Sequence, residues 1–428
     1  MPISFLVPEN PPITLRSQLL PNLLPALCLA VALPVYAAKK PAKPAPKSET
    51  RPAAEAPKAP EVQGEFLTVG YLAQAEASPP VQPFFDPVIA DRGLQGARLG
   101  IQDDNTTGRF TRQNFTLQET VVPADGDLAS AFKALAGSGQ RHILLNLPAA
   151  LIAQLAALPE AQNVLLYDIA SRDDALRAQG CRANVLHLLP SRAMRADALA
   201  QYLSKKRWQK WFLAVGPSEG DKLYAEAIRQ SAKKFGAKIV TDKPWEHSFD
   251  ERRTPESEVP VFTEGAEYDV VVVADESGLF GDYFPYRTWQ PRPVAGSAGL
   301  VPTAWHRTHE MWGALQLQNR FREQAGRWMT EEDYGAWLAV RAIGEAATRT
   351  KSVEFDKLKG FMLGEEFSLA GFKGVPLSFR RWDHQLRQPV LLAADRSLVA
   401  VAPIEGYLHP RNELDTLGYD EAESKCKF

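Results

Sequence analysis

The sequence predicts an α/β fold of two similar lobes, each a mainly parallel sheet flanked by helices, with a cleft between the lobes. Short apolar runs alternate with amphipathic stretches over residues 66–169, and the alternation starts again at residue 184. Such alternation is typical of right-handed βαβ crossovers. The unbroken β-branched run at 270–273 is typical of a strand buried on both faces. The alternative architecture is a single doubly wound sheet with an appended helical domain.

Turn residues and helix-start signals separate the elements of the first unit. Asp127 is a favoured residue just before a helix, and Pro148 is favoured in a first turn. The pattern predicts strands at 66–72, 115–122, 142–147 and 164–169, and helices at 89–103, 127–136 and 148–157.

The second unit continues the alternation and ends in helices and a β return. The charged stretch 246–262, which contains Pro255 and Pro260, is predicted to be a surface loop. Trp312 and Trp337 fall inside amphipathic helices and are expected in the core. We expect strands at 184–188, 211–215, 237–241, 270–273, 293–295 and 377–381, a hairpin of 390–394 with 398–402, and helices at 192–206, 219–235, 305–324, 331–349 and 353–364.

The N-terminal residues predict export. Arg16 precedes the apolar stretch 19–33, which ends in Val35-Tyr36-Ala37-Ala38, as a secretory signal peptide does. A membrane anchor is disfavoured because the run is short and prolines interrupt it. Residues 38–64 are rich in proline, alanine and lysine, which predicts a disordered linker.

The elements therefore divide the chain into a signal peptide at 1–37, a linker at 38–64, two lobes and a C-terminal tail. Both lobes are expected to be discontinuous. Lobe 1 is expected to comprise residues 65–188 and 303–365, lobe 2 residues 189–302 and 366–410, and the tail residues 411–428.

Composition and motifs exclude several functions. The formal net charge of −2 gives no reason to expect nucleic acid as a partner. The G-x-S-x-G pattern occurs at Gly216-Pro217-Ser218-Glu219-Gly220, where we interpret it as a strand-to-helix turn rather than a nucleophile elbow, and the chain has no phosphate-binding glycine loop. His306 and His309 do not have the spacing of a zinc-binding H-E-x-x-H motif. Cys181 and Cys426 would both remain after export, and their spacing does not decide whether they pair.

The order of elements over residues 65–410 resembles the type I periplasmic solute-binding proteins of the branched-chain amino-acid ABC transporter group. Segments 268–321 and 328–350, the latter WMTEEDYGAWLAVRAIGEAATRT, are similar to the subgroup that accompanies pyrroloquinoline quinone (PQQ)-dependent alcohol dehydrogenase systems. The resemblance implies a soluble periplasmic binding protein rather than an enzyme, with a small-molecule ligand and no required cofactor. It also implies an inner-membrane ABC permease or a PQQ-dependent dehydrogenase as partner, and PQQ as the expected ligand.

One departure from the amino-acid binders bears on the ligand. Those proteins typically hold the ligand α-carboxylate with a Ser/Thr-rich turn after the third strand of lobe 1. Here that place is Asn146-Leu147-Pro148-Ala149-Ala150, which has no hydroxyl. This departure disfavours a zwitterionic amino acid as the ligand, and a branched-chain amino acid or another small organic acid is the alternative to PQQ. A periplasmic enzyme or metal carrier, using His306 and His309 with the acids Asp275 and Glu276, is the alternative of another class.

Candidate ligand-binding residues follow the predicted strand ends. Guanidinium groups match the carboxylates of a planar anionic ligand, and tryptophan rings stack on its ring. Hydroxyls in strand-to-helix turns add hydrogen-bonding groups, and Asp275 ends a buried strand, whereas Glu276 beside it is given a structural role. The predicted site comprises Arg172, Ser171, Arg192, Ser191, Ser218, Asp275, Trp289 and Trp305, with no catalytic residue and no metal ligand.

Overall fold

The computed structural model describes residues 64–75, 88–246 and 254–428. The expected signal peptide at 1–37 lies outside these residues, as does the expected linker except for Gly64. Within the described ranges, none of the helices combines the length and the apolar character needed to cross a membrane.

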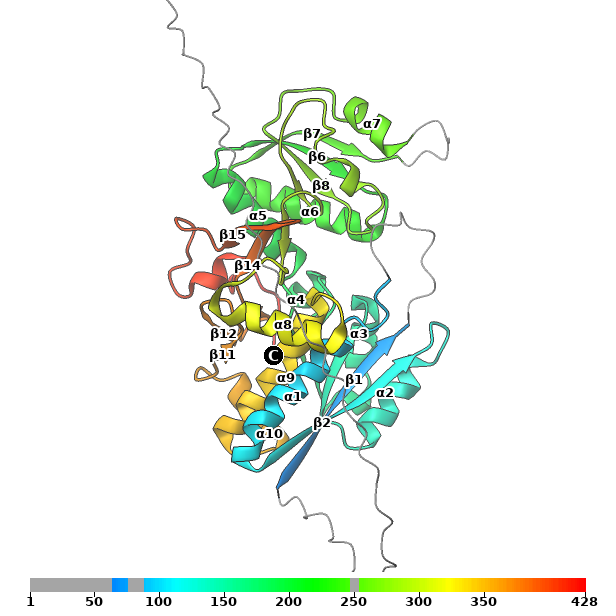
Figure 1. Cartoon of the computed structure of the whole chain (residues 1–428), viewed down its shortest axis with the longest axis vertical. Coiled ribbons are helices and arrows are strands. Elements are labelled where there is room, and N and C mark those ends of the chain that lie inside the picture. The colour runs from blue at the N-terminus through cyan, green and yellow to red at the C-terminus, as the bar shows by residue number, and fades with distance from the viewer. Residues whose placement is uncertain (1–63, 76–87, 247–253) are drawn as a thin grey trace, which may run out of the picture. The chain divides into compact units, whose positions relative to one another are not determined.

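A parallel sheet forms the centre of the first lobe (Figure 1). Its strand order is β2-β1-β3-β4-β5, and β1 pairs with β2 along its whole length. The five strands are β1 (Glu65–Gln74), β2 (Gln113–Val122), β3 (His142–Asn146), β4 (Leu165–Asp168) and β5 (Val185–His187).

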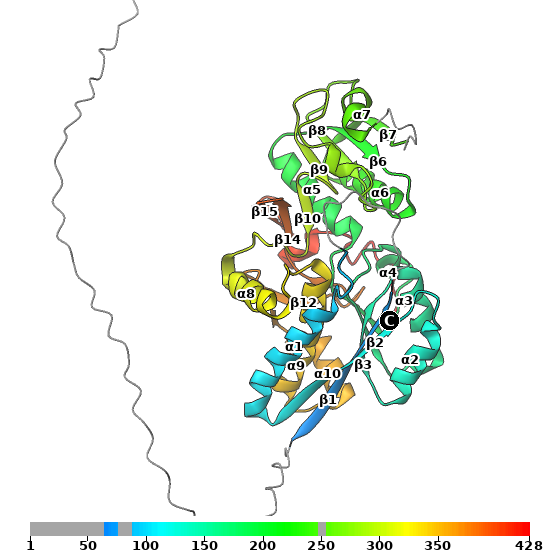
Figure 2. The same cartoon turned by 45° about the vertical axis from the view of Figure 1, so that its right-hand side comes forward.

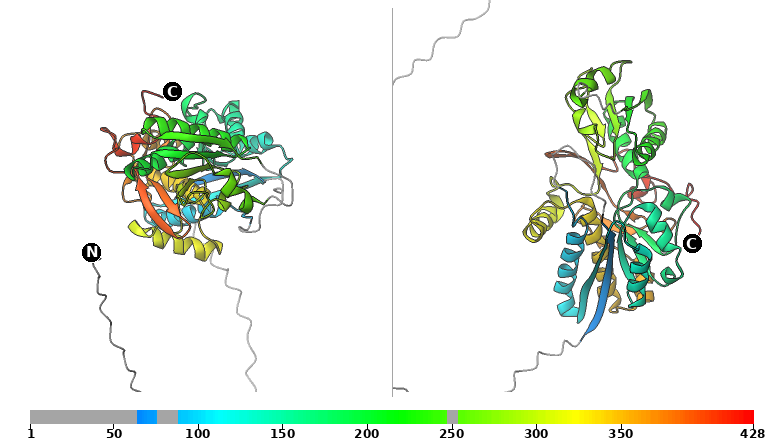
Figure 3. Two further views of the ribbon diagram at one scale, coloured as in Figure 1. Left: turned by 90° about the horizontal axis from the view of Figure 1, so that it is seen from above. Right: turned by 90° about the vertical axis from the view of Figure 1, so that its right-hand side faces the viewer.

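Helices cover both faces of this sheet, α1 and α9 on one side and α2 and α3 on the other (Figures 2 and 3). Successive strand residues face opposite sides, so Leu144 packs towards α9 and Leu145 towards α3. The helices of this region are α1 (Leu94–Thr111), α2 (Leu128–Gly137), α3 (Ala149–Ala156), α4 (Ala175–Ala178), α8 (Ala314–Ala325), α9 (Glu331–Thr350) and α10 (Phe355–Met362).

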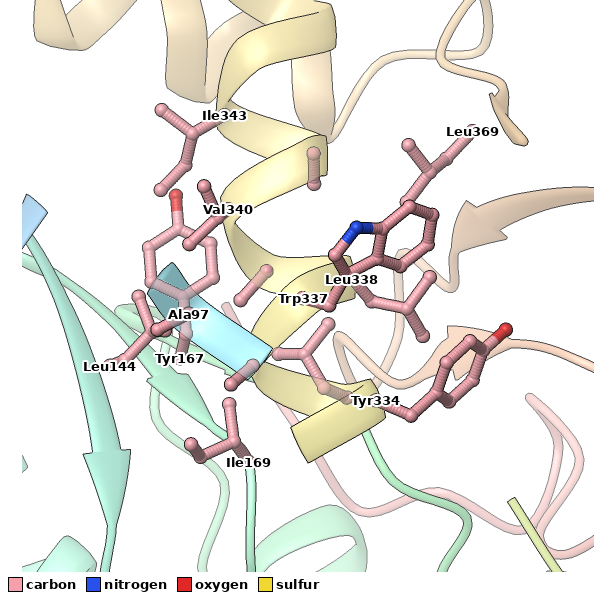
Figure 4. Packing of buried hydrophobic residues seen from close by; sticks show 14 of the residues in the cluster. Ala97, Leu144, Tyr167, Ile169, Tyr334, Trp337, Leu338, Val340, Ile343 and Leu369 are labelled. Atoms are coloured by element: carbon pink, nitrogen blue, oxygen red, sulfur yellow. The ribbon is translucent and has the colours of Figure 1, made fainter. Parts of the chain in front are cut away.

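Helix α9 supplies the largest part of this core (Figure 4). Tyr334, Trp337 and Val340 are fully or almost fully buried along it, and Ala97 of α1 lies in the same cluster. Trp337 is 2% exposed, as expected of a core residue. The two helices approach closely because α1 presents Gly96 to the α9 backbone.

The second lobe has a parallel sheet in the order β7-β6-β8-β9. Helices α5 and α6 cover one face and α7 the other, and all five residues of β8 are buried between them. The elements are β6 (Lys210–Val215), β7 (Lys238–Pro244), β8 (Val270–Ala274), β9 (Val294–Gly296), α5 (Arg192–Lys205), α6 (Glu219–Lys234) and α7 (Pro255–Phe262).

Two small antiparallel sheets complete the fold. The predicted terminal hairpin is confirmed as β14 paired with β15, and β10 adds to its other side. The strands are β10 (Val301–Thr303), β14 (Val390–Ala394) and β15 (Ser397–Ala402), and, in the other sheet, β11 (Leu369–Ala370), β12 (Pro376–Phe379) and β13 (Leu386–Arg387).

The predicted surface loop at 246–262 is wrong in its second half, which forms α7. Thr254 caps this helix with a capping box, and proline is tolerated in a first helical turn because the N–H it lacks has no intrahelical partner there. Val259 is fully buried against the second sheet, so tertiary packing stabilises the helix.

The predicted helices at 305–324 and 89–103 are displaced along the chain. Trp312 and Gly313 both have left-handed backbone angles, with φ of 59° and 87°, so α8 begins only at Ala314. Trp312 is 61% exposed and is not a core residue, contrary to the prediction. Gly93, with φ of 82°, delays the start of α1 to Leu94.

The predicted lobe boundaries also differ near the C-terminus. Residues 366–410 were expected in lobe 2, but Leu369, Leu377 and Leu386 bury their side chains in the first-lobe core. Residues 411–428 are not a simple tail, because Leu417 is fully buried in the second-lobe core. Cys181 and Cys426 form a disulfide, with their Cα atoms 5.5 Å apart.

The contact between α1 and α9 gives a test of the packing. An added Cβ at Gly96 would lie 1.8 Å from the carbonyl oxygen of Asp333. Because this oxygen belongs to the backbone, the helices must move apart, and we expect Gly96→Ala to lower the free energy of unfolding by about 3 kcal/mol. Urea denaturation measures this. Gly137→Ala is the control, since its Cβ would meet no atom within 4 Å; equal midpoints for the two variants would contradict the packing argument.

Candidate functional site

A cavity of about 270 Å³ lies between residues of the two lobes. The first lobe contributes Arg172, which follows β4, and Glu331, the first residue of α9. The second lobe contributes Arg195 of α5 and Tyr224 of α6, together with the loops that follow β8 and β9. The carboxyl ends of parallel strands are the usual place for ligands in α/β sheets.

Glu331 is the centre of the charged groups in this cavity. Its carboxylate accepts a hydrogen bond from Arg172 at 2.8 Å and another from Arg195. The Thr303 hydroxyl and the Ala304 backbone N–H also donate to it. Burial by itself raises the pKa of Glu331, but Arg195 and Arg172 outweigh burial and lower it to about 2. Glu331 is therefore ionised and joins groups from both lobes.

A second ion-pair group lies beside the first. Arg192 of α5 donates through Nε and Nη2 to Oε2 of Glu276, at 2.9 and 2.7 Å. It also reaches Asp173 of the first lobe at 3.5 Å. The Oε1 atom of Glu276 accepts no hydrogen bond from the described part of the chain in this arrangement.

Two buried aspartates fix the loop that follows β8 in the cavity wall. The Asp275 carboxylate accepts from the backbone N–H groups of Leu279, Phe280 and Gly281, at 3.1, 2.8 and 2.6 Å. Asp221, which also completes the capping box of α6, accepts from Ser277 N at 3.0 Å. Because these bonds occupy Asp275, it shapes the wall and leaves little acceptor capacity for an ammonium group.

Two buried hydrogen-bond donors, on residues that line the cavity, have no partner among the described residues. They are Nε of Arg172, from the first lobe, and the hydroxyl of Tyr224, from the second. Tyr224 is only 3% exposed, and burial raises the pKa of its hydroxyl, which therefore keeps its proton at neutral pH. A buried donor without a partner is costly, so both groups favour a ligand that supplies an acceptor.

The structure brings only part of the sequence-predicted site to the cavity. Arg172 and Asp275 line it, whereas Arg192 does not line it but bonds Glu276, which does. Ser191 and Ser218 instead cap α5 and α6, where each accepts a hydrogen bond from a backbone N–H. Ser171 is buried and accepts from the Asp173 backbone at 3.2 Å.

Neither predicted tryptophan lies in the cavity wall. Trp289 is 57% exposed, and Trp305 is buried and stacked on Tyr334 with ring centroids 4.3 Å apart. The predicted stacking surface for a planar ligand is therefore not formed by these two rings. Trp305 has a packing role instead, because its side chain is buried in the first-lobe core and fixes the segment after β10 against it.

Sequence reasoning missed Glu331, Arg195 and Tyr224. Tyr224 and Arg195 lie within amphipathic or polar helix patterns, which do not show that a hydroxyl or guanidinium reaches a cavity. Thr330-Glu331-Glu332-Asp333 is a capping-box sequence that marks the start of a helix, and this signal locates Glu331 at a helix end.

The two histidines of the alternative enzyme or metal-carrier hypothesis do not line this cavity, and they lie in an irregular segment rather than on a helix. His306 pairs with Thr308, and His309 bonds the carbonyl of Phe372 at 2.7 Å. Across residues 64–75, 88–246 and 254–428, no group of three or more His, Cys, Asp or Glu side chains is arranged to hold a metal ion.

Glu331→Gln tests the ion-pair centre. It leaves two arginines without their shared carboxylate, so we expect the free energy of unfolding to fall by about 3 kcal/mol near neutral pH. The folded-state pKa is lowered from 4.5 to about 2, so this stability is present above about pH 4.5 and is lost as the pH falls towards 2. Urea unfolding of the wild-type protein and the variant at a series of pH values measures this. The difference between their free energies of unfolding should become smaller as the pH falls from about 4.5 towards 2.

Glu332→Gln is the matched control. Its carboxylate lies 3.6 Å from Arg172 and 3.9 Å from Arg92, in a looser arrangement at the same helix end. We expect this substitution to lower the free energy of unfolding by less than about 1 kcal/mol. A Glu331→Gln effect no larger than this control would show that Glu331 is not the centre of the network.

No protein-family model matches this chain, and no curated protein sequence matches it. Solved structures match its fold. A periplasmic binding protein from Burkholderia mallei has a TM-score of 0.62 and 11% identity, covering 85% of this chain and 98% of that one. The leucine-, isoleucine-, valine-, threonine- and alanine-binding protein from Brucella ovis has a TM-score of 0.60 and 15% identity, covering 84% and 97%.

A third matching structure is a solute-binding protein of an ABC transporter from Rhodopseudomonas palustris BisB5, in complex with 3,4-dihydroxybenzoic acid. Its TM-score is 0.54 and its identity 12%, with coverage of 77% of this chain and 93% of that one. These likenesses confirm the predicted fold class: the chain has the two-lobed α/β fold of the type I periplasmic binding proteins.

Proposed function

We propose that this protein is a periplasmic ligand-binding component of an ABC-type uptake or delivery system, and that it holds a small organic acid between its lobes. The observation that carries the proposal is the pair of unpartnered donors, Arg172 Nε and the Tyr224 hydroxyl, one from each lobe. A ligand carboxylate that accepts from both donors joins the lobes. A non-enzymatic role fits the ligand-binding proteins that share the fold.

The charges of the cavity favour a ligand with one carboxylate over a ligand with several. Its lining contains four acids (Asp275, Glu276, Asp282 and Glu331) and two arginines, and both arginines already pair with Glu331. A polyanion would place its further carboxylates near these acids, which is unfavourable. The open Oε1 of Glu276 suits an ammonium group, so an amino acid fits this cavity as well as a simple acid does.

PQQ, the ligand implied by the sequence resemblance, is the second candidate. Arg172 supports it, since a guanidinium suits a carboxylate of a quinone ligand. The number of acids in the lining and the absence of Trp289 and Trp305 from the cavity wall weigh against it. Delivery to an inner-membrane permease accompanies the small-acid proposal, whereas PQQ would favour a PQQ-dependent dehydrogenase as partner.

Isothermal titration of the purified protein distinguishes these ligands. We expect binding of leucine or of 3,4-dihydroxybenzoate, each with one carboxylate, and weaker or no binding of PQQ. Tight binding of PQQ alone would replace the proposed ligand class but keep the binding function. If none of the three compounds gives a heat of binding, the proposed ligand class is contradicted.

Tyr224→Phe tests the donor pair. It removes one hydroxyl and little volume, so we expect the Kd of a bound acid to rise about tenfold, the loss of about one hydrogen bond. Titration with the ligand identified above measures the change. Tyr286→Phe is the control, because Tyr286 is fully exposed. An unchanged Kd for Tyr224→Phe would place the carboxylate elsewhere.

A further inference from the structure

The C-terminal strap, residues 413–428, begins within the second lobe. Its first part is the short helix η4 (Glu413–Thr416), and Leu417 after it is fully buried among residues of α5 and α6. The Gly418 N–H donates to Asp197 of α5 at 2.9 Å, and Lys234 of α6 donates to the Gly418 carbonyl at 3.1 Å. This end of the strap is therefore held by both packing and hydrogen bonds.

The other end of the strap is fixed to the first lobe (Figure 2). Cys426 is joined by the disulfide to Cys181, in the segment between α4 and β5. The Lys425 N–H donates to the Ala178 carbonyl at 3.1 Å. The ring of Phe428 stacks on His384, between β12 and β13, with ring centroids 4.1 Å apart. The attachment is thus covalent and has supporting contacts on each side.

A buried arginine holds the middle of the strap. Arg380, which follows β12, is 1% exposed and donates to the carbonyls of Leu414 and Leu417, at 3.1 and 2.8 Å. It also bonds the Asp415 carboxylate at 2.9 Å, and Arg387 bonds the same carboxylate at 2.7 Å. Both arginines belong to the hairpin whose apolar residues pack in the first-lobe core. The strap is therefore bonded to the first lobe before it reaches the disulfide.

The length of the strap limits how far the two lobes can move apart. Cys426 follows Gly418 by eight positions, which corresponds to about 28 Å in a fully extended chain. The segment is not extended, because the N–H groups of Glu423 and Ser424 both bond the Asp420 carbonyl, at 3.0 and 3.1 Å. Moving the lobes far apart requires this turn to unfold or the Arg380 bonds to break.

We propose that the C-terminal strap is a fourth covalent connection between the lobes and limits how far they separate. The three others are the main-chain passages between β5 and α5, after β10, and between β13 and β14. In a protein that binds its ligand between two lobes, such a limit favours the closed state and slows ligand release. The effect on ligand release rests on the proposed function, whereas the limit on lobe separation does not.

The double substitution Cys181→Ser with Cys426→Ser tests the restraint on the full chain without ligand. We expect small-angle X-ray scattering to show a larger radius of gyration than for the wild-type protein. Glu421→Gln is the control, since Glu421 pairs with Arg411 at 2.8 Å on the exposed surface of the same C-terminal region and does not reach the first lobe. We expect its scattering curve to match that of the wild type.

A double variant that unfolds cooperatively and scatters as the wild type does would overturn the proposal. If the double variant does not fold, the comparison uses wild-type protein reduced with dithiothreitol and alkylated with iodoacetamide in native buffer, and the same expectation applies. Because no ligand is present, failure of this test leaves the proposed binding function standing. Failure of the ligand titrations leaves the scattering result unaffected.

Discussion

The Glu331 carboxylate accepts hydrogen bonds from groups that the chain brings together from distant segments. Arg172 comes from the first lobe, Arg195 from the second, and Thr303 and Ala304 from the passage that connects them. A buried carboxylate with this many donors is ionised, and each arginine is held in a fixed direction. Glu331 at 2.8 Å and Glu332 at 3.6 Å orient Arg172, whose buried Nε has no partner among the described residues.

The other charged groups of the cavity are also bonded by partners within the protein. The charged groups of the cavity wall are largely used by the protein itself: backbone N–H groups bond Asp275, and Arg192 bonds Glu276. What remains for a ligand is a small number of polar atoms supplied by both lobes. Our proposal of a small acid as ligand rests on these atoms, which come from both lobes.

Turn and cap chemistry in the sequence located much of the secondary structure but not the lobe boundaries. Asp127 and the alternating pattern of 115–122 predicted α2 and β2 nearly at their observed ends. The segment at 366–387 packs in the first lobe, contrary to the prediction, because its short strands carry no signal for the core against which they pack. Likewise, left-handed angles at Trp312 and Gly313 depend on the surrounding loop, and periodicity alone continued the helix through them.

The sequence by itself determined the fold class, because alternating strand and helix patterns restrict the chain to parallel sheets with crossovers. It also placed Arg172 and Asp275 at strand ends, where α/β proteins bind ligands. Only the tertiary structure decided which polar groups stay open and which are satisfied internally. Glu331 lines the same cavity as Arg195 and Tyr224, which precede it by more than one hundred residues. Cys181 and Cys426 pair across 245 residues, and local patterns contain no information about such long-range contacts.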